Sequence, residues 1–118
     1  MTARNESSTS VRVRCADPEV IRRAVAGFAA EVRAAHPELR RMRWFGSWIT
    51  GGWSLGSDVD LCIVVDHSFR PVRERTVDYR PRVFPVGIDL FIYTEDELER
   101  LRTEHPSFAR AMDAGVEI

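Results

Sequence analysis

The sequence predicts a two-layer α/β domain in which a small mixed sheet packs helices on one face. Three segments that we expect to be strands, 39–45, 59–65 and 86–92, alternate with stretches of helical periodicity, which is typical of this class. The longest such stretch, 17–35, repeats apolar residues on one helical face, and further helices are expected at 95–103 and 106–114. Acidic residues occur on the strands, and we expect them on the sheet face opposite the helices.

Local signals mark where these elements begin and end. Asp17 can cap the first helix, Pro18 suits the first helical position, and Glu19 suits the positive end of the helix dipole. Thr94 and Glu97 form a capping-box pattern ahead of the helix at 95–103. A short helix is expected at 50–55, and 116–118 is expected to be a short strand or a tail.

Length and composition predict one soluble domain at 17–118, preceded by a flexible tail or edge strand at 1–16. A chain of 118 residues with 44% hydrophobic and 30% charged residues suits one globular core. No segment approaches the ~20 apolar residues of a membrane span, and the polar first ten residues do not resemble a signal peptide. The two cysteines lack metal-site spacing, so we expect a cytoplasmic protein.

The charge content argues against several functions. A formal net charge of −1 provides no general attraction to nucleic acid, which makes a nucleic-acid partner unlikely on electrostatic grounds. All 17 basic residues are arginines, which excludes a phosphate-binding loop of the Walker type and a lysine Schiff base.

One stretch carries the features of a metal-dependent site. Gly46-Ser47 is followed by ten residues and then by Asp58-x-Asp60, which opens the apolar segment 59–65. Two carboxylates spaced two residues apart on a strand point to the same side and repel each other unless a cation lies between them. Oxygen ligands of this kind suit Mg²⁺, and the Gly-Ser turn can offer N–H groups and a hydroxyl to a phosphate.

This spacing resembles the signature of the nucleotidyltransferase superfamily that includes DNA polymerase beta, and the small size resembles its minimal nucleotidyltransferase (MNT) branch. Gly51, five residues after the first glycine, and Ser57, directly before the first aspartate, extend the match. The resemblance implies transfer of a nucleoside monophosphate, AMP from ATP, to a hydroxyl group. It also implies that the nucleotide is bound by Gly46, Ser47 and Ser57.

A third acid completes the pattern that the resemblance implies. Asp89 lies in an otherwise apolar segment, where an unpaired carboxylate would be costly to bury. The family has its third acid in the same context, so the resemblance assigns catalysis and the binding of two Mg²⁺ ions to Asp58, Asp60 and Asp89 together. Without that resemblance, Asp89 could equally be a structural aspartate that bonds to a turn or an arginine.

One departure from the family pattern leaves an alternative open. Family members often carry arginines at the second and fourth positions after the glycine, and this chain has Trp48 and Thr50 there. Neither of these side chains can neutralise a triphosphate as arginine does. The positive charge would then have to come from Arg43, Arg80 or Arg82, if one of them reaches the site. The alternative is therefore a degenerate domain that binds a nucleotide or partner without catalysis. Trp48 and Trp53 either stack on a base or fill gaps in the core.

The acceptor hydroxyl is not defined by the sequence. Proteins of this appearance are commonly paired with a HEPN-type helical toxin, which implies an antitoxin that modifies its partner. A small-molecule acceptor resembling an aminoglycoside is the competing possibility. A homo-oligomer and a monomer both remain open.

Overall fold

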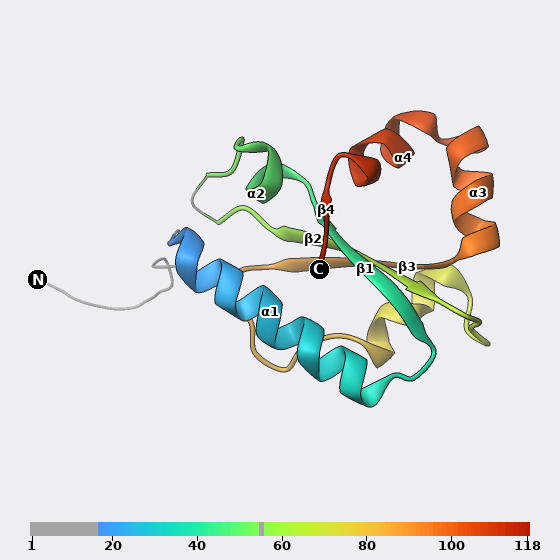
Figure 1. Cartoon of the computed structure of the whole chain (residues 1–118), viewed down its shortest axis with the longest axis horizontal. Helices are drawn as coiled ribbons and strands as arrows, with labels where there is room; N and C mark the ends of the chain where they lie inside the picture. Colours follow the sequence, from blue (N-terminus) through green and yellow to red (C-terminus); the bar gives the residue numbers. More distant parts are fainter. Residues whose placement is uncertain (1–16, 55) are drawn as a thin grey trace, which may run out of the picture.

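A four-stranded mixed sheet forms the centre of the molecule (Figure 1). The structure is a computed structural model that describes residues 17–54 and 56–118. The strand order is β3-β2-β1-β4, with β2 antiparallel to β1, β4 antiparallel to β1, and β3 parallel to β2. The elements in chain order are α1 (Pro18–Ala35), β1 (Leu39–Phe45), α2 (Ser47–Thr50), β2 (Val59–Val65), the 3₁₀ helix η2 (Val72–Asp78), β3 (Ile88–Thr94), α3 (Glu95–Glu104), α4 (Pro106–Asp113) and β4 (Val116–Glu117).

The predicted α/β class and mixed sheet are confirmed, and so are the signals at two helix starts. The Asp17 carboxylate accepts a hydrogen bond from the Glu19 N–H at 3.0 Å, with Pro18 in the first helical position. At α3, the Thr94 side chain and the Glu97 side chain cap each other's backbone N–H groups. Both helices therefore begin where their orphan N–H groups find side-chain acceptors.

The helices cover both faces of the sheet, so the expectation that they all lie on one face was wrong. Apolar side chains of α1 pack on the face of the sheet that includes Leu61 and Ile63. On the other face, Cys62 and Val64 pack against Leu98 of α3 and Met112 of α4. Figure 1 shows α3 and α4 on the side of the sheet opposite α1. Successive residues of a strand point to opposite sides, and β2 is apolar on both sides. Helices therefore pack on both faces of this strand.

Two elements lie at different positions from those that the sequence predicts. The short helix lies at Ser47–Thr50 rather than at 50–55, because it starts directly after Gly46. The third strand is Ile88–Thr94 rather than 86–92, and it runs straight into the capping residue of α3. The predicted tail or edge strand at 1–16 lies outside the described residues. Within the part of the chain that is described, no helix is both long enough and apolar enough to span a membrane.

A buried ion pair joins the β2–β3 crossover to the start of α3. Arg75 in η2 is 5% exposed and donates two hydrogen bonds to the Glu97 carboxylate, at 2.6 and 2.9 Å. The same guanidinium donates to the Ile92 carbonyl at 3.1 Å and to the Arg70 carbonyl at 2.9 Å. Its donors are thus shared among three segments, and this holds η2 against the edge strand β3.

We predict that this pair makes the protein sensitive to acid. The hydrogen bonds from Arg75 hold the pKa of Glu97 at about 2, below its ordinary value of 4.5. Because the folded-state pKa is depressed, the stabilisation is complete above about pH 4.5 and is lost as the pH falls toward 2. Glu97→Gln should therefore lower the free energy of unfolding by about 3 kcal/mol at pH 7. Chemical denaturation across pH 7 to 3 measures this.

Glu99, an exposed residue of the same helix, provides the matched control. Glu99→Gln should follow the wild-type stability curve at every pH. The gap between Glu97→Gln and wild type should narrow as the pH falls below 4, and a gap that stays constant down to pH 3 would contradict the pKa assignment.

Candidate active site

The candidate site lies at the edge of the sheet where the parallel strands β2 and β3 begin. Asp60 is the second residue of β2, and the strand register pairs it directly with Asp89, the second residue of β3. Adjacent strands lie ~4.8 Å apart, so paired side chains on one face are neighbours. Asp58 directly precedes β2, and the following N–H, that of Val59, donates to the Gly87 carbonyl at 2.9 Å. The three predicted acids therefore share one edge of the sheet.

Two glycines make room for two of these carboxylates. A Cβ placed on Gly46 would lie 2.2 Å from Oδ2 of Asp60, and a Cβ on Gly87 would lie 2.2 Å from Oδ1 of Asp58. Gly46 also has a φ of 89°, which residues with a side chain rarely adopt. Gly87 was not singled out from the sequence, although a glycine directly before an acidic strand is a usable signal of close approach.

The carboxylates interact electrostatically. The pKa of Asp60 is raised from 3.8 to about 6, first by burial and then by the nearby charges of Asp89 and Asp58. Asp60 is half-buried, whereas Asp58 and Asp89 are exposed. Like charges that crowd a half-buried carboxyl disfavour its ionisation, and a bound cation would relieve that repulsion.

The donor chemistry of these side chains fits Mg²⁺, which prefers carboxylate oxygens and retains several waters. As they stand, however, no three His, Cys, Asp or Glu side chains among residues 17–54 and 56–118 form a ready-made metal cluster. The carboxylates of Asp58 and Asp89 are exposed to solvent, and their charges raise the pKa of the neighbouring Asp60. The sequence suggested that Asp89 would be buried in an apolar strand at an energetic cost. That was wrong, because the Asp89 side chain is exposed to solvent.

The residues predicted to bind nucleotide fall into two groups. Gly46 lies against Asp60, and Ser47 follows it as the first residue of α2. Ser57 belongs to a turn: its Oγ accepts from the Ser54 N–H at 2.8 Å, and its N–H donates to the Ser54 carbonyl at 3.0 Å. Thus Gly46 directly contacts an acid of the site, while the Ser57 hydroxyl is engaged within the loop before Asp58.

None of the three arginines considered as substitutes is placed at the acids. Arg43 donates to the Gly115 carbonyl at 2.8 Å and lies 3.6 Å from the Glu117 carboxylate. Arg80 and Arg82 line a cavity beside the second half of α1, on the opposite face of the sheet. The positive charge that the family pattern places after the glycine is therefore not supplied from these positions.

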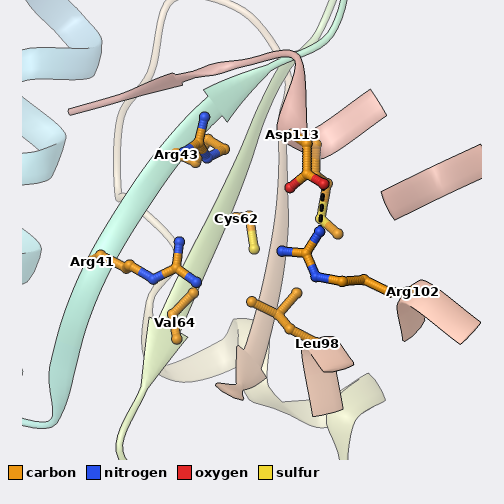
Figure 2. Close-up of a pocket in the computed structure, with 8 residues that line it drawn as sticks. Arg41, Arg43, Cys62, Val64, Leu98, Arg102 and Asp113 are labelled. Atoms are coloured by element: carbon orange, nitrogen blue, oxygen red, sulfur yellow. Dashed lines mark hydrogen bonds and ion pairs between the residues drawn. The ribbon is translucent and has the colours of Figure 1, made fainter. Parts of the chain in front are cut away.

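A separate pocket lies on the sheet face that carries Asp60, farther along β2, between β1, β2 and the helices α3 and α4 (Figure 2). Cys62 lies at its centre, two residues beyond Asp60, and the side chains of three arginines approach it. Burial raises the pKa of the Cys62 thiol to about 11, so the thiol is neutral near pH 7. Cys62 therefore packs as a small buried apolar residue of β2.

The arginines of that pocket already have partners. Arg41 donates to Glu95 at 3.0 and 3.2 Å, and Arg102 forms an ion pair with Asp113 (Figure 2). Arg43 is bound to a backbone carbonyl near the end of the chain. Because these cations are paired, the pocket is not an anion site and does not extend the candidate active site.

The fold and the site together define a class. A mixed sheet that gathers three aspartates at the start of two parallel strands, beside a Gly-Ser turn, is the arrangement expected of a nucleotidyltransferase. A family model described as "Nucleotidyltransferase domain" matches residues 25–85, more than half of the chain. This chain belongs to that nucleotidyltransferase family, which is of the DNA polymerase beta type. The match includes Asp58 and Asp60 but ends before Asp89, whose place in the site follows from the register of β3.

A solved structure supports the same fold. The chain is 21% identical to a protein from Sulfolobus solfataricus that is provisionally assigned as a nucleotidyltransferase, with a TM-score of 0.59. The similarity covers 70% of this chain and 75% of the other. No curated protein sequence matches the chain.

We predict that the charge of Asp60 destabilises the metal-free protein at neutral and higher pH. Because the folded-state pKa is raised to about 6, the wild-type carboxyl stabilises the fold below about pH 4, and this is lost as the pH rises through 6. At pH 8 the free energy of unfolding of Asp60→Asn should exceed that of wild type by about 1–3 kcal/mol, which raises its unfolding temperature, and this difference should vanish near pH 4. Thermal unfolding without divalent cations measures the difference.

Asp66, an exposed aspartate just after β2 that pairs with Arg40, is the control. Asp66→Asn should give no stabilisation at pH 8. If Asp60→Asn is no more stable than wild type at pH 8, the three carboxylates do not repel one another as described.

Proposed function

We propose that the chain is a Mg²⁺-dependent nucleotidyltransferase that moves a nucleoside monophosphate, AMP from ATP, to a hydroxyl acceptor. The observation that carries the proposal is the pairing of Asp60 with Asp89 and the approach of Asp58 at the same sheet edge. Membership of the nucleotidyltransferase family supports the reaction class. Repulsion among the three nearby carboxylates favours binding of a divalent cation, because the cation would relieve it.

The carboxylates of Asp58, Asp60 and Asp89 are the groups that would hold Mg²⁺. Two bound Mg²⁺ ions would neutralise the triphosphate and lower the pKa of the acceptor hydroxyl. The Gly46-Ser47 turn, which abuts Asp60, would hold the departing phosphates through its N–H groups and hydroxyl.

In the proposed reaction the acceptor oxygen forms a bond to the α-phosphorus while the bond to the bridging oxygen of pyrophosphate breaks. Asp89 is exposed at the site and would accept the proton of the attacking hydroxyl. Asp58 and Asp89 both face solvent, which leaves this edge of the sheet open to a large acceptor.

We predict that ATP binds only when a divalent cation is present. Titration calorimetry of ATP with and without Mg²⁺ should show binding that is lost in Asp58→Asn and Asp60→Asn and retained in Asp66→Asn. The physical reason is that the crowded carboxylates would repel a bare triphosphate and attract it only through a cation. Loss of one carboxylate ligand should weaken binding by at least about tenfold, or about 1.4 kcal/mol.

One set of observations favours the alternative of a binding module without catalysis. Trp48 and Thr50 replace the arginines of the family pattern, and Arg43 is engaged elsewhere. ATP binding that is indifferent to Mg²⁺ and to both substitutions would support that alternative and remove the metal assignment. Binding that requires Mg²⁺ without turnover would leave a degenerate enzyme that still holds its nucleotide.

For the acceptor we propose a hydroxyl on a HEPN-type toxin, which rests on the resemblance to minimal nucleotidyltransferases and is compatible with the open site. Incubating the chain with Mg²⁺, ATP and a HEPN-type protein from the neighbouring reading frame should add one or more AMP units to that partner. Intact-protein mass spectrometry detects the gain, and Asp60→Asn is the matched control.

An unmodified partner, under conditions where ATP binding is demonstrated, would argue against the antitoxin role. The same mass measurement on a panel of aminoglycosides then tests the small-molecule alternative. A gain of equal size with Asp60→Asn would assign the modification to a contaminant rather than to this site.

A further inference from the structure

Trp48 links the two ends of the loop that joins α2 to β2. It lies in α2, directly after the Gly46-Ser47 turn, and its indole packs against the core cluster that includes α1. Its Nε1–H donates a hydrogen bond to the Ser57 carbonyl at 2.9 Å, across nine residues of chain. The indole therefore connects the glycine turn to the residue that precedes Asp58.

The same ring is stacked on a second indole within the loop. Trp53 lies with its ring centroid 4.6 Å from that of Trp48, and the two planes differ by only 10°. Such offset aromatic pairs contribute about 0.5–1.5 kcal/mol beyond the area that they bury. The loop thus has two attachments to Trp48, one at Trp53 and one at Ser57, and an internal turn between Ser54 and Ser57.

These attachments act on the backbone of Asp58. The Ser57 carbonyl belongs to the peptide unit that ends in the Asp58 N–H, and because peptide units are planar, fixing the carbonyl fixes that unit. On the other side, the Val59 N–H is held by the Gly87 carbonyl at 2.9 Å. Asp58 is therefore anchored on both sides, by Trp48 through the preceding peptide and by β3 through the following one.

We propose that Trp48 is a positioning residue that fixes the backbone at Asp58 and so keeps its carboxylate against Gly87, beside Asp60. The proposal rests on the proposed function in treating these carboxylates as the cation site. It explains the departure from the family pattern in physical terms. At the second position after the glycine this chain has an indole, rather than a guanidinium, and the indole holds the loop before Asp58 in place.

The effect of losing the Trp48 indole N–H differs between a role in positioning Asp58 and a role in core packing alone. If the indole only fills space at the edge of the core, its loss lowers global stability but leaves the cation affinity of the folded protein unchanged. If it positions Asp58, loss of the Nε1–H alone weakens cation binding at temperatures where the variant is folded. Trp48→Phe removes that N–H and retains an aromatic ring that can stack on Trp53.

Trp44 offers a matched control. It is a buried core indole, 7% exposed, and its Nε1 finds no hydrogen-bond partner among the described residues. Trp44→Phe therefore makes the same chemical change, in the core cluster against which Trp48 packs, without removing a hydrogen bond to the loop. Any effect shared by both variants reflects core packing, and an effect confined to Trp48→Phe reflects the hydrogen bond to Ser57.

The test combines two measurements on the full chain, with folding verified by circular dichroism. The first is Mn²⁺ affinity by electron paramagnetic resonance, which should weaken about tenfold in Trp48→Phe and stay within about twofold of wild type in Trp44→Phe. The second is residue-resolved amide exchange by NMR. Exchange of the Ser54, Ser57 and Val59 amides, which are hydrogen-bonded in this structure, should accelerate only in Trp48→Phe.

Wild-type Mn²⁺ affinity in Trp48→Phe, or unchanged exchange at those three amides, would overturn the proposal. If wild type binds no Mn²⁺, the proposed metal site fails, and amide exchange still decides whether Trp48 anchors Asp58. If Trp48→Phe does not fold, exchange of the indole N–H groups in the wild-type protein replaces it. Protection of the Trp48 Nε1–H comparable to that of the Ser57 and Val59 amides supports the anchor, and rapid exchange of that N–H overturns it.

Discussion

The parallel pairing of β2 with β3 is the constraint on which the site depends. It places Asp60 opposite Asp89. It also brings Gly87 next to the Asp58 carboxylate, and the Gly87 carbonyl accepts a hydrogen bond from the Val59 N–H. A parallel pair cannot be closed by a tight hairpin, so the chain must cross over, and η2 lies on that crossover. The ion pair between Arg75 and Glu97 then holds the crossover against the edge strand, at the far end of β3 from the acids.

Like charges are gathered at one end of a sheet whose other polar groups are mostly satisfied. In the rest of the described chain, arginines such as Arg41, Arg75 and Arg102 are paired with carboxylates. Around Asp60 the neighbours are instead two further aspartates, and burial together with these two charges raises the pKa of Asp60. Three aspartates that lie close together, two of them against glycines where a side chain would not fit, have the electrostatics expected of a cation site.

The presence of an indole where the family pattern has an arginine changes how the glycine turn serves the site. An arginine after Gly46 would contribute charge to a bound phosphate, whereas Trp48 contributes a hydrogen bond and a stacked surface to the protein itself. The two roles are not interchangeable, because an indole N–H carries one neutral donor and a guanidinium carries five with a full charge. In this chain the turn is tied to the loop before Asp58 by the hydrogen bond from Trp48 to Ser57, and Trp48 adds no positive charge beside the turn.

The sequence alone determined the features that depend on near neighbours in the chain: the α/β class, the capped starts of α1 and α3, the strands at 39–45 and 59–65, and the Gly-Ser and Asp-x-Asp motif. Capping, periodicity and motif spacing are local, so they can be read from short windows. Only the tertiary structure decided that α3 and α4 cover the acidic face, that Asp89 is exposed, that Gly87 adjoins Asp58, and that Trp48 bonds to Ser57. These features depend on strand register and on which of two apolar faces a helix covers, and a strand apolar on both faces, such as β2, does not specify that choice by itself.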